Sequence, residues 1–238
     1  MAIGAYTTAI LLSRHPHLSF VYVGVWVILS GAIFGLLIGI PTLRLKGDYL
    51  AIASLGFGEI VKNVLLNADT LTGGPMGISL PIKSFDKGLF LGMVWLVVCL
   101  VLLGLIQLQR SHWGRGLEAI REDELAAQSV GLNTPLYKGA AFMIGAAISA
   151  MAGMLWALYH GSAIPQTFDS TLSIMVLCMV VLGGLGNYYG SLFGTMVIVV
   201  ISELPRLLGF SAIIPAAVNQ ILFGIILVSL VILRQKKS

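Results

Sequence analysis

The sequence predicts an all-α membrane protein that crosses the bilayer several times. The chain of 238 residues is 58% hydrophobic and only 10% charged, with a mean hydropathy of +0.97, whereas soluble domains carry about 25% charged residues. Long stretches contain no Asp, Glu, Lys or Arg, and they cover residues 15–43, 88–109, 139–168, 170–202 and 207–233. Each is long enough for a helix to cross the hydrocarbon core, and in lipid only a helix or a closed barrel satisfies its own backbone.

The membrane segments can be placed along the chain from these stretches. We expect them at about 1–13, 20–43, 49–66, 88–108, 139–160, 170–186, 188–204 and 213–233. This makes about seven transmembrane helices plus a partial one at the N-terminus, within a single transmembrane domain over residues 1–238. The opening "MAIGAYTTAILL" has the composition of a membrane helix already under way. We therefore expect the chain to begin partway through a larger fold.

The distribution of Lys and Arg between the loops predicts the orientation. With residues 109–138 in the cytoplasm, the inner loops hold most of the basic residues: Arg44, Lys46, Arg110, Arg115, Arg121, Lys138, Arg234, Lys236 and Lys237. The outer loops hold Arg14, Lys83, Lys87 and Arg206. This orientation requires residues 170–202 to cross twice. Gly183 and Gly184 are the plausible break, which predicts a broken or re-entrant helix there.

Small residues recur at every fourth position in several segments. The series are Gly31, Gly35 and Gly39; Gly145, Ser149 and Gly153; and Gly186, Gly190 and Gly194. This spacing lets membrane helices approach closely, so it predicts a tightly packed bundle with no chemical role for these residues.

Charged and polar residues interrupt one membrane segment. Glu59 and Lys62 are three residues apart on a helix and can pair, and Asn63 follows them. A charge inside a membrane segment costs at least about 2.5–3.5 kcal/mol on insertion scales, so it normally faces protein or water. Two interpretations stay open: these residues line a substrate pathway, or they neutralise each other structurally.

The loop that follows, "DTLTGGPMGIS", contains the turn-forming string Thr72, Gly73, Gly74 and Pro75. It either caps a pathway or meets an external partner, or it is an ordinary turn, which its composition alone favours. We count these four residues, with Glu59, Lys62 and Asn63, as candidates for the translocation path.

A cytoplasmic loop at about 110–138 gathers acidic residues: Glu118, Glu122, Asp123 and Glu124. We expect one helix over residues 117–130, with charges around most of its circumference and a poor apolar stripe, so it is not expected to lie flat on lipid. Gly131 can end this helix, and Pro135 cannot continue it. Ala126 and Ala127 offer a smooth surface for close docking. From these residues alone, a solvated helix in a loop, with no docking role, is the favoured interpretation.

Four stretches together resemble a known family. They are "LRLKGDYLAIASLGFGEIVKNVLLN", "LTGGPMGI", "GRGLEAIREDELAAQSVGLN" and "MVVLGGLGNYYGSLFG". They resemble the permease subunits of branched-chain amino acid ABC importers, the LivM type, and the resemblance covers residues 1 to about 205. Glu124, Ala126, Ala127 and Gly131 resemble the EAA-like motif of the coupling helix in such importers, although Leu125 separates the glutamate from the alanines.

The resemblance implies how the chain works and with what. It implies a multi-pass protein of the bacterial cytoplasmic (inner) membrane with a sister permease of the LivH type, two ABC ATPase subunits and a periplasmic or extracellular amino-acid-binding protein. Cytoplasmic coupling to the ATPases would involve Glu118, Arg121, Glu122, Glu124, Ala126, Ala127 and Gly131. ATP and Mg²⁺ would be used by the partner subunits, and this chain would bind no cofactor. Leucine, isoleucine and valine are the favoured substrates; other amino acids, amides or urea stay open.

Other function classes are less consistent with the residues. The basic residues flank hydrophobic runs instead of forming one face, which argues against nucleic acid. No phosphate-binding G-x-x-x-x-G-K-[ST] loop is present, and the four histidines are scattered without metal-ligand spacing. We therefore expect no enzymatic activity and no metal site. An ion- or proton-coupled transporter or channel using Glu59 and Lys62 is the alternative that the charged residues leave open.

Overall fold

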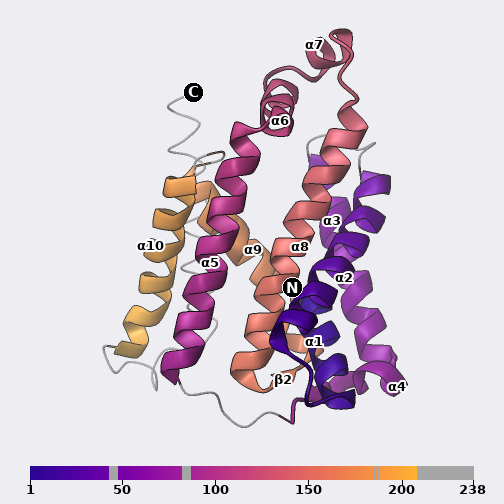
Figure 1. The fold of residues 1–238 in the computed structure, drawn as a ribbon, viewed down its shortest axis with the longest axis vertical. Coiled ribbons are helices and arrows are strands. Elements are labelled where there is room, and N and C mark those ends of the chain that lie inside the picture. The colour runs from indigo at the N-terminus through magenta and orange to yellow at the C-terminus, as the bar shows by residue number, and fades with distance from the viewer. Residues whose placement is uncertain (43–47, 82–86, 185, 187, 208–238) are drawn as a thin grey trace. The chain divides into compact units, whose positions relative to one another are not determined.

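A computed structural model of the chain describes residues 1–42, 48–81, 87–184, 186 and 188–207 (Figure 1). In chain order the elements are α1 (Ala2–Arg14), α2 (Phe20–Thr42), α3 (Asp48–Asn67), α4 (Asp69–Thr72), the 3₁₀ helix η1 (Gly74–Met76), β1 (Ile78–Ser79), α5 (Lys87–Arg110), α6 (His112–Glu122), α7 (Glu124–Ser129), α8 (Thr134–His160), β2 (Ser162–Ala163), the 3₁₀ helix η2 (Pro165–Thr167), α9 (Ser170–Gly183) and α10 (Tyr188–Leu207). The predicted all-α class is confirmed.

Within the described residues, four helical stretches are long and apolar enough to cross a membrane. They are Phe20–Pro41, Lys87–Arg110, Thr134–His160 and Pro165–Gly183. α3 is not among them, and it is the helix that carries Glu59 and Lys62. The last predicted segment, 213–233, lies outside the described residues.

The chain divides into two compact units, Met1–Asp169 and Ser170–Ser238. In the first unit, α8 packs against both α1 and α2. The predicted glycine series forms the seam between α2 and α8. A Cβ atom on Gly31 would lie 2.6 Å from the Cβ of Ala150, and one on Gly35 would lie 2.5 Å from the Cβ of Ala146. Both distances are below carbon–carbon contact, so these positions admit only glycine at this helix separation.

α1 packs on α8 in the same way. A Cβ on Gly4 would overlap the main chain of Ala150, which places the two backbones in direct contact. The hydroxyl of the fully buried Thr8 donates to the carbonyl oxygen of Gly4 at 2.7 Å. Its polar group is therefore satisfied within the helix, as an apolar surrounding requires.

The second unit contains a helical hairpin of α9 and α10. The predicted break is confirmed: α9 ends at Gly183, and both Gly184 and Gly186 have positive φ. The two arms touch through glycine, because a Cβ on Gly194 would lie 2.6 Å from the amide nitrogen of Gly183. Close approach through small residues is the arrangement that their spacing predicted.

Candidate functional site

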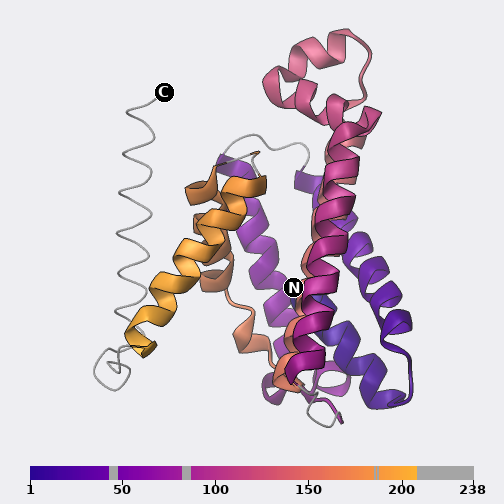
Figure 2. The same ribbon diagram turned by 60° about the vertical axis from the view of Figure 1, so that its left-hand side comes forward.

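The candidate site residues of the first unit lie at its two opposite ends. Figures 1 and 2 show α6 and α7 projecting beyond the ends of α5 and α8, whereas α4, β1 and β2 lie at the other end. On the predicted orientation, α6 and α7 are cytoplasmic, and the end with α4 faces outward.

The projecting segment consists of two short helices, so the prediction of a single helix over residues 117–130 is wrong. α6 ends at Glu122 and α7 begins at Glu124, with an extended residue, Asp123, between them (φ −150°, ψ 110°). The Asp123 carboxylate accepts hydrogen bonds from the amides of Leu125 (2.9 Å) and Ala126 (3.1 Å). This is an N-cap, which aspartate favours because its oxygen satisfies amides that have no partner in the helix.

α6 is held against the ends of α5 and α8. The Ser111 hydroxyl accepts from the amide of Gly114 at its N-terminus. Gly116 faces Tyr137, whose ring lies 4.6 Å from that of Trp113 between centroids. Gly114, Gly116 and Ile120 are buried, so α6 has a packed face that the charge pattern did not predict.

α7 is tied to the first turn of α8 by two side-chain contacts. The Glu124 carboxylate lies 2.6 Å from the Lys138 ammonium, and the Gln128 amide donates to the Thr134 hydroxyl at 2.9 Å. Glu124, expected to contact the ATPase, therefore already has an intramolecular partner. Its first role in this structure is to orient α7.

Gly131 ends α7 as predicted. Its φ is +89°, and the Leu132 amide donates back across it to the Ala127 carbonyl oxygen at 3.1 Å. This reversal requires a left-handed residue, which is far easier for glycine than for other residues.

The other coupling candidates differ in exposure. Glu118, Arg121, Glu122 and Ala126 are exposed, whereas Ala127 is 5% exposed and packs inward. Two apolar side chains that the sequence argument did not select are far more open: Leu125 is 69% exposed and Val130 is 84% exposed. Their hydrophobicity beside the acidic cluster was the signal available in the sequence. We call Leu125, Ala126 and Val130 the α7 patch.

At the opposite end, Lys62 holds a charged cluster together. Its ammonium lies 2.7 Å from the Asp169 carboxylate and 3.9 Å from that of Glu59. The predicted pairing with Glu59 is therefore present but is the longer contact. Asp169 was not anticipated, because it lies 107 positions away in the chain, and only the fold brings it beside α3.

Asn63 and the Thr72–Pro75 turn have mainly structural contacts. The Asn63 amide donates to the carbonyl oxygen of Glu59 at 2.9 Å. The buried Thr72 hydroxyl donates to the carbonyl oxygens of Leu65 and Ala68, at 2.6 and 2.8 Å. A Cβ on Gly74 would overlap the Asp69 carboxylate.

The turn is also joined to the segment after α8. The Gln166 amide donates to the Pro75 carbonyl oxygen at 3.1 Å, and β1 pairs antiparallel with β2, with Ile78 opposite Ala163. Hydrogen bonds to the segment after α8 therefore hold the turn in place, and it covers the end of the unit at which α3 and α8 both finish. Among the described residues, no three His, Cys, Asp or Glu side chains gather closely enough to hold a metal ion.

Comparisons with known proteins give this geometry its context. The family model "branched-chain amino acid transport system / permease component" matches residues 1–231. The chain is 39% identical to the high-affinity branched-chain amino acid transport system permease protein LivM of Escherichia coli, over 86% of this chain and 55% of that protein. It is 32% identical to a probable LivM of Methanocaldococcus jannaschii, over 74% of this chain and 54% of that protein.

More distant permeases also match. The chain is 28% identical to the E. coli permease protein LivH over 60% of its length and 45% of that protein. It is 30% identical to the autoinducer 2 import system permease protein LsrC of Klebsiella pneumoniae, over 86% of this chain and 59% of that protein. No solved structure matches.

The chain spans about half the length of the curated relatives it matches. The family match extends through both units and includes the candidate coupling segment α6–α7, the charged cluster around Lys62 and the glycine seam. The chain therefore belongs to the family of permease components of branched-chain amino acid transport systems.

Proposed function

We propose that the chain forms part of the translocation path of an ATP-driven importer for branched-chain amino acids in the bacterial cytoplasmic membrane. In this proposal it acts with a sister permease, two ABC ATPase subunits and an external amino-acid-binding protein, and it hydrolyses nothing itself. The family match supports the class of transporter. The observation that carries the coupling role is the projecting α6–α7 segment with its exposed α7 patch (Figure 2).

The α7 patch has the character of a protein-docking surface. Leu125 and Val130 are large, exposed apolar residues, one in α7 and one directly after it, and Figure 1 shows α7 projecting beyond α5 and α8. On the predicted orientation this projection is cytoplasmic, so lipid would not cover them. Ala126 is exposed beside them and permits close approach. Desolvated apolar anchors supply most of the binding energy in an interface. The exposed acids Glu118 and Glu122, on the neighbouring helix, would supply orientation and a faster encounter.

The anchoring of α7 makes it suitable for transmitting force. The Glu124–Lys138 contact of 2.6 Å and the Gln128–Thr134 hydrogen bond join it to the start of α8. A displacement of α7 by an ATPase would therefore be passed to α8 and not absorbed by a slack loop. The N-cap at Asp123 and the reversal at Gly131 fix both ends of α7.

At the outer end, the proposal assigns Glu59, Lys62 and Asp169 to bracing the mouth of the path. Lys62 is 22% exposed and both carboxylates are about twice as open, at 43% and 42%. A partly exposed triad of this kind is compatible with a water-filled entrance, where charged residues in membrane proteins are normally found.

Co-purification tests the coupling role. The tagged chain would be expressed with the neighbouring ATPase and sister-permease genes, and the retained ATPase would be measured. Leu125→Glu is expected to lower ATPase retention at least tenfold, because burying a glutamate against an apolar groove forfeits the contact and desolvates a charge. Leu71→Glu is the matched control, because Leu71 is similarly exposed, at 58% against 69%, but lies on α4 at the opposite end.

Equal retention of the ATPase by the two variants would contradict docking through the α7 patch. Uptake of leucine into proteoliposomes that is independent of ATP, and that follows an ion gradient instead, would contradict the importer assignment itself.

A further inference from the structure

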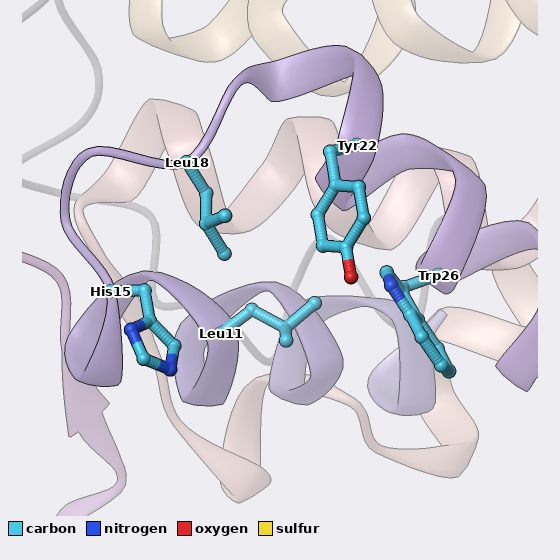
Figure 3. Close-up of a pocket in the computed structure, with 5 residues that line it drawn as sticks. All are labelled: Leu11, His15, Leu18, Tyr22 and Trp26. Atoms are coloured by element: carbon cyan, nitrogen blue, oxygen red, sulfur yellow. The ribbon is translucent and has the colours of Figure 1, made fainter.

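A pocket of about 360 Å³ lies between the end of α1 and the start of α2. Its lining residues are Leu11, His15, Leu18, Tyr22 and Trp26 (Figure 3). Figure 3 shows His15 and Leu18 at one end of the pocket, Tyr22 and Trp26 at the other, and Leu11 between them, with the Tyr22 hydroxyl directed toward α1. The Tyr22 and Trp26 rings meet edge to face at 6.2 Å. None of these residues belongs to the coupling end or to the charged cluster around Lys62.

The pocket offers hydrogen-bond donors that the described part of the chain does not use. The side chains of Tyr22, Trp26 and His15 make no hydrogen bond there. Arg14 lies in the last turn of α1, directly before the lining residue His15; it is exposed and makes no ion pair with any described residue. Aromatic rings with a polar tip are typical of the boundary between hydrocarbon and water.

The charge around the pocket has one sign. Residues 1–42 contain no Asp or Glu, and the connection from α1 to α2 carries Arg14, His15 and His17. An anion would therefore meet a cation and hydrogen-bond donors within this part of the chain. Among the described elements that pack against α1, the one acidic residue is Asp69 of α4. A phosphodiester is such an anion, and arginine is well suited to bind it.

An apolar stripe leads away from the pocket along α2. Tyr22, Trp26, Leu29 and Ile33 follow the spacing of one helix face, and their side chains are 49%, 47%, 48% and 63% exposed. α2 contains one of the candidate membrane spans, Phe20–Pro41, so the stripe runs from the boundary toward the bilayer centre. A hydrocarbon chain on this stripe would bury apolar surface while its head group stayed at the pocket.

We propose that this pocket binds an anionic glycerophospholipid, with the phosphate held by Arg14 and His15 at the connection from α1 to α2, and one acyl chain lying past Tyr22 and Trp26 along the α2 stripe. A transmembrane helix of another subunit is the competing occupant. The charges favour the lipid, because an apolar helix packed here would desolvate Arg14 without giving it an anion. The proposal rests on the membrane location of α2 and not on the transported substrate.

The test is native mass spectrometry of the chain purified with its partner subunits and titrated with phosphatidylglycerol. One lipid should bind well above the non-specific background. The double substitution Arg14→Gln/His15→Gln should raise its Kd about tenfold, equivalent to about 1.4 kcal/mol, and Trp26→Leu, which changes the surface under the acyl chain, should raise it by a smaller factor. Trp95→Leu is the control, because Trp95 is also exposed (62%) but lies on α5.

Several results would overturn the proposal. One is an unchanged Kd in both pocket variants, with size-exclusion profiles that show them folded. Another is equal binding of soluble glycerophosphoglycerol, which would mean that the acyl chain contributes nothing. A third test uses a variant of this chain that keeps Trp26 and has its other tryptophans replaced. Bromine-labelled phosphatidylglycerol should quench the fluorescence of Trp26. Absence of quenching would show that protein covers the pocket. Tyr22→Phe, which removes one hydroxyl, provides a milder variant if the double substitution fails to fold.

Discussion

One pair of glycine-to-alanine substitutions in α2 separates two contributions to stability: the packing of α2 against α8 at the seam, and helix propensity. Gly35 and Gly24 both lie in α2, but a Cβ on Gly35 would lie 2.5 Å from the Cβ of Ala146 and 2.9 Å from the carbonyl oxygen of Phe142, whereas a Cβ on Gly24 meets nothing within 4 Å. Replacing either glycine by alanine raises helix propensity by about 1 kcal/mol. That gain is common to both variants, so the difference between their stabilities measures the cost of overpacking the seam.

The magnitude follows from the distances. Carbon atoms in contact lie about 3.5–4.0 Å apart, so Gly35→Ala requires α2 and α8 to separate by about 1 Å at this point. Overpacking of this kind costs about 1–3 kcal/mol. A gap of that size also removes about a quarter to a half of the dispersion energy at each neighbouring contact. For a chain of this length, the melting temperature should be lower for Gly35→Ala than for Gly24→Ala by about 2–12 °C.

The assay is thermal unfolding of the purified complex, followed by size-exclusion chromatography after heating. The compensating substitution Ala146→Gly removes the side chain that the new methyl group strikes. The double variant Gly35→Ala/Ala146→Gly should therefore recover part of the loss, which a double-mutant cycle measures. Identical melting temperatures for Gly35→Ala and Gly24→Ala, or no recovery in the double variant, would refute the packing argument.

Two further predictions concern the ends of the unit. Asp169→Asn should reduce uptake in proteoliposomes more than Glu59→Gln does, because Asp169 is at charge-assisted hydrogen-bond distance from Lys62 (2.7 Å) and Glu59 is not (3.9 Å); the reverse order would show that Glu59 is the functional partner. Gly131→Ala should destabilise the chain by about 1–2 kcal/mol because its φ of +89° is left-handed and its surroundings are open. The loss should be smaller for Gly131→Asn, and thermal unfolding that ranks the two variants equally would contradict this.

Sequence periodicity and composition predicted the helices well because each membrane segment is defined locally. The break at Gly183 and the close seam at Gly31 and Gly35 were also readable, since both depend on the size of one residue. The start of α8 at Thr134 was missed by five residues from the expected 139. Its first turn is polar, with the Asn133 side chain accepting from the Leu136 amide, and hydropathy does not detect such a turn.

The site was predicted less completely because its contacts join distant parts of the chain. Asp169 reaches Lys62 only after α8 has returned the chain to the end of the unit where α4 lies (Figure 1). The expected helix over 117–130 was wrong because Asp123 can cap a new helix as easily as it can continue an old one. Ala127 was expected at the docking surface, but the two-helix geometry turns it inward and leaves Leu125 outside.

α8 physically connects the two ends. It begins directly after α7 and ends directly before the segment that carries β2, Gln166 and Asp169. Its 27 residues, at about 1.5 Å each, give a length of about 40 Å. α1 and α2 hold it through backbone contacts at Gly4, Gly31 and Gly35, which leave little room for it to bend. A displacement of α7 would therefore move α8 as a rigid helix, and the displacement would reach the Lys62–Asp169 contact at the far end. The glycine seam would then matter for more than stability, because opening it by about 1 Å would let α8 move without displacing α1 and α2.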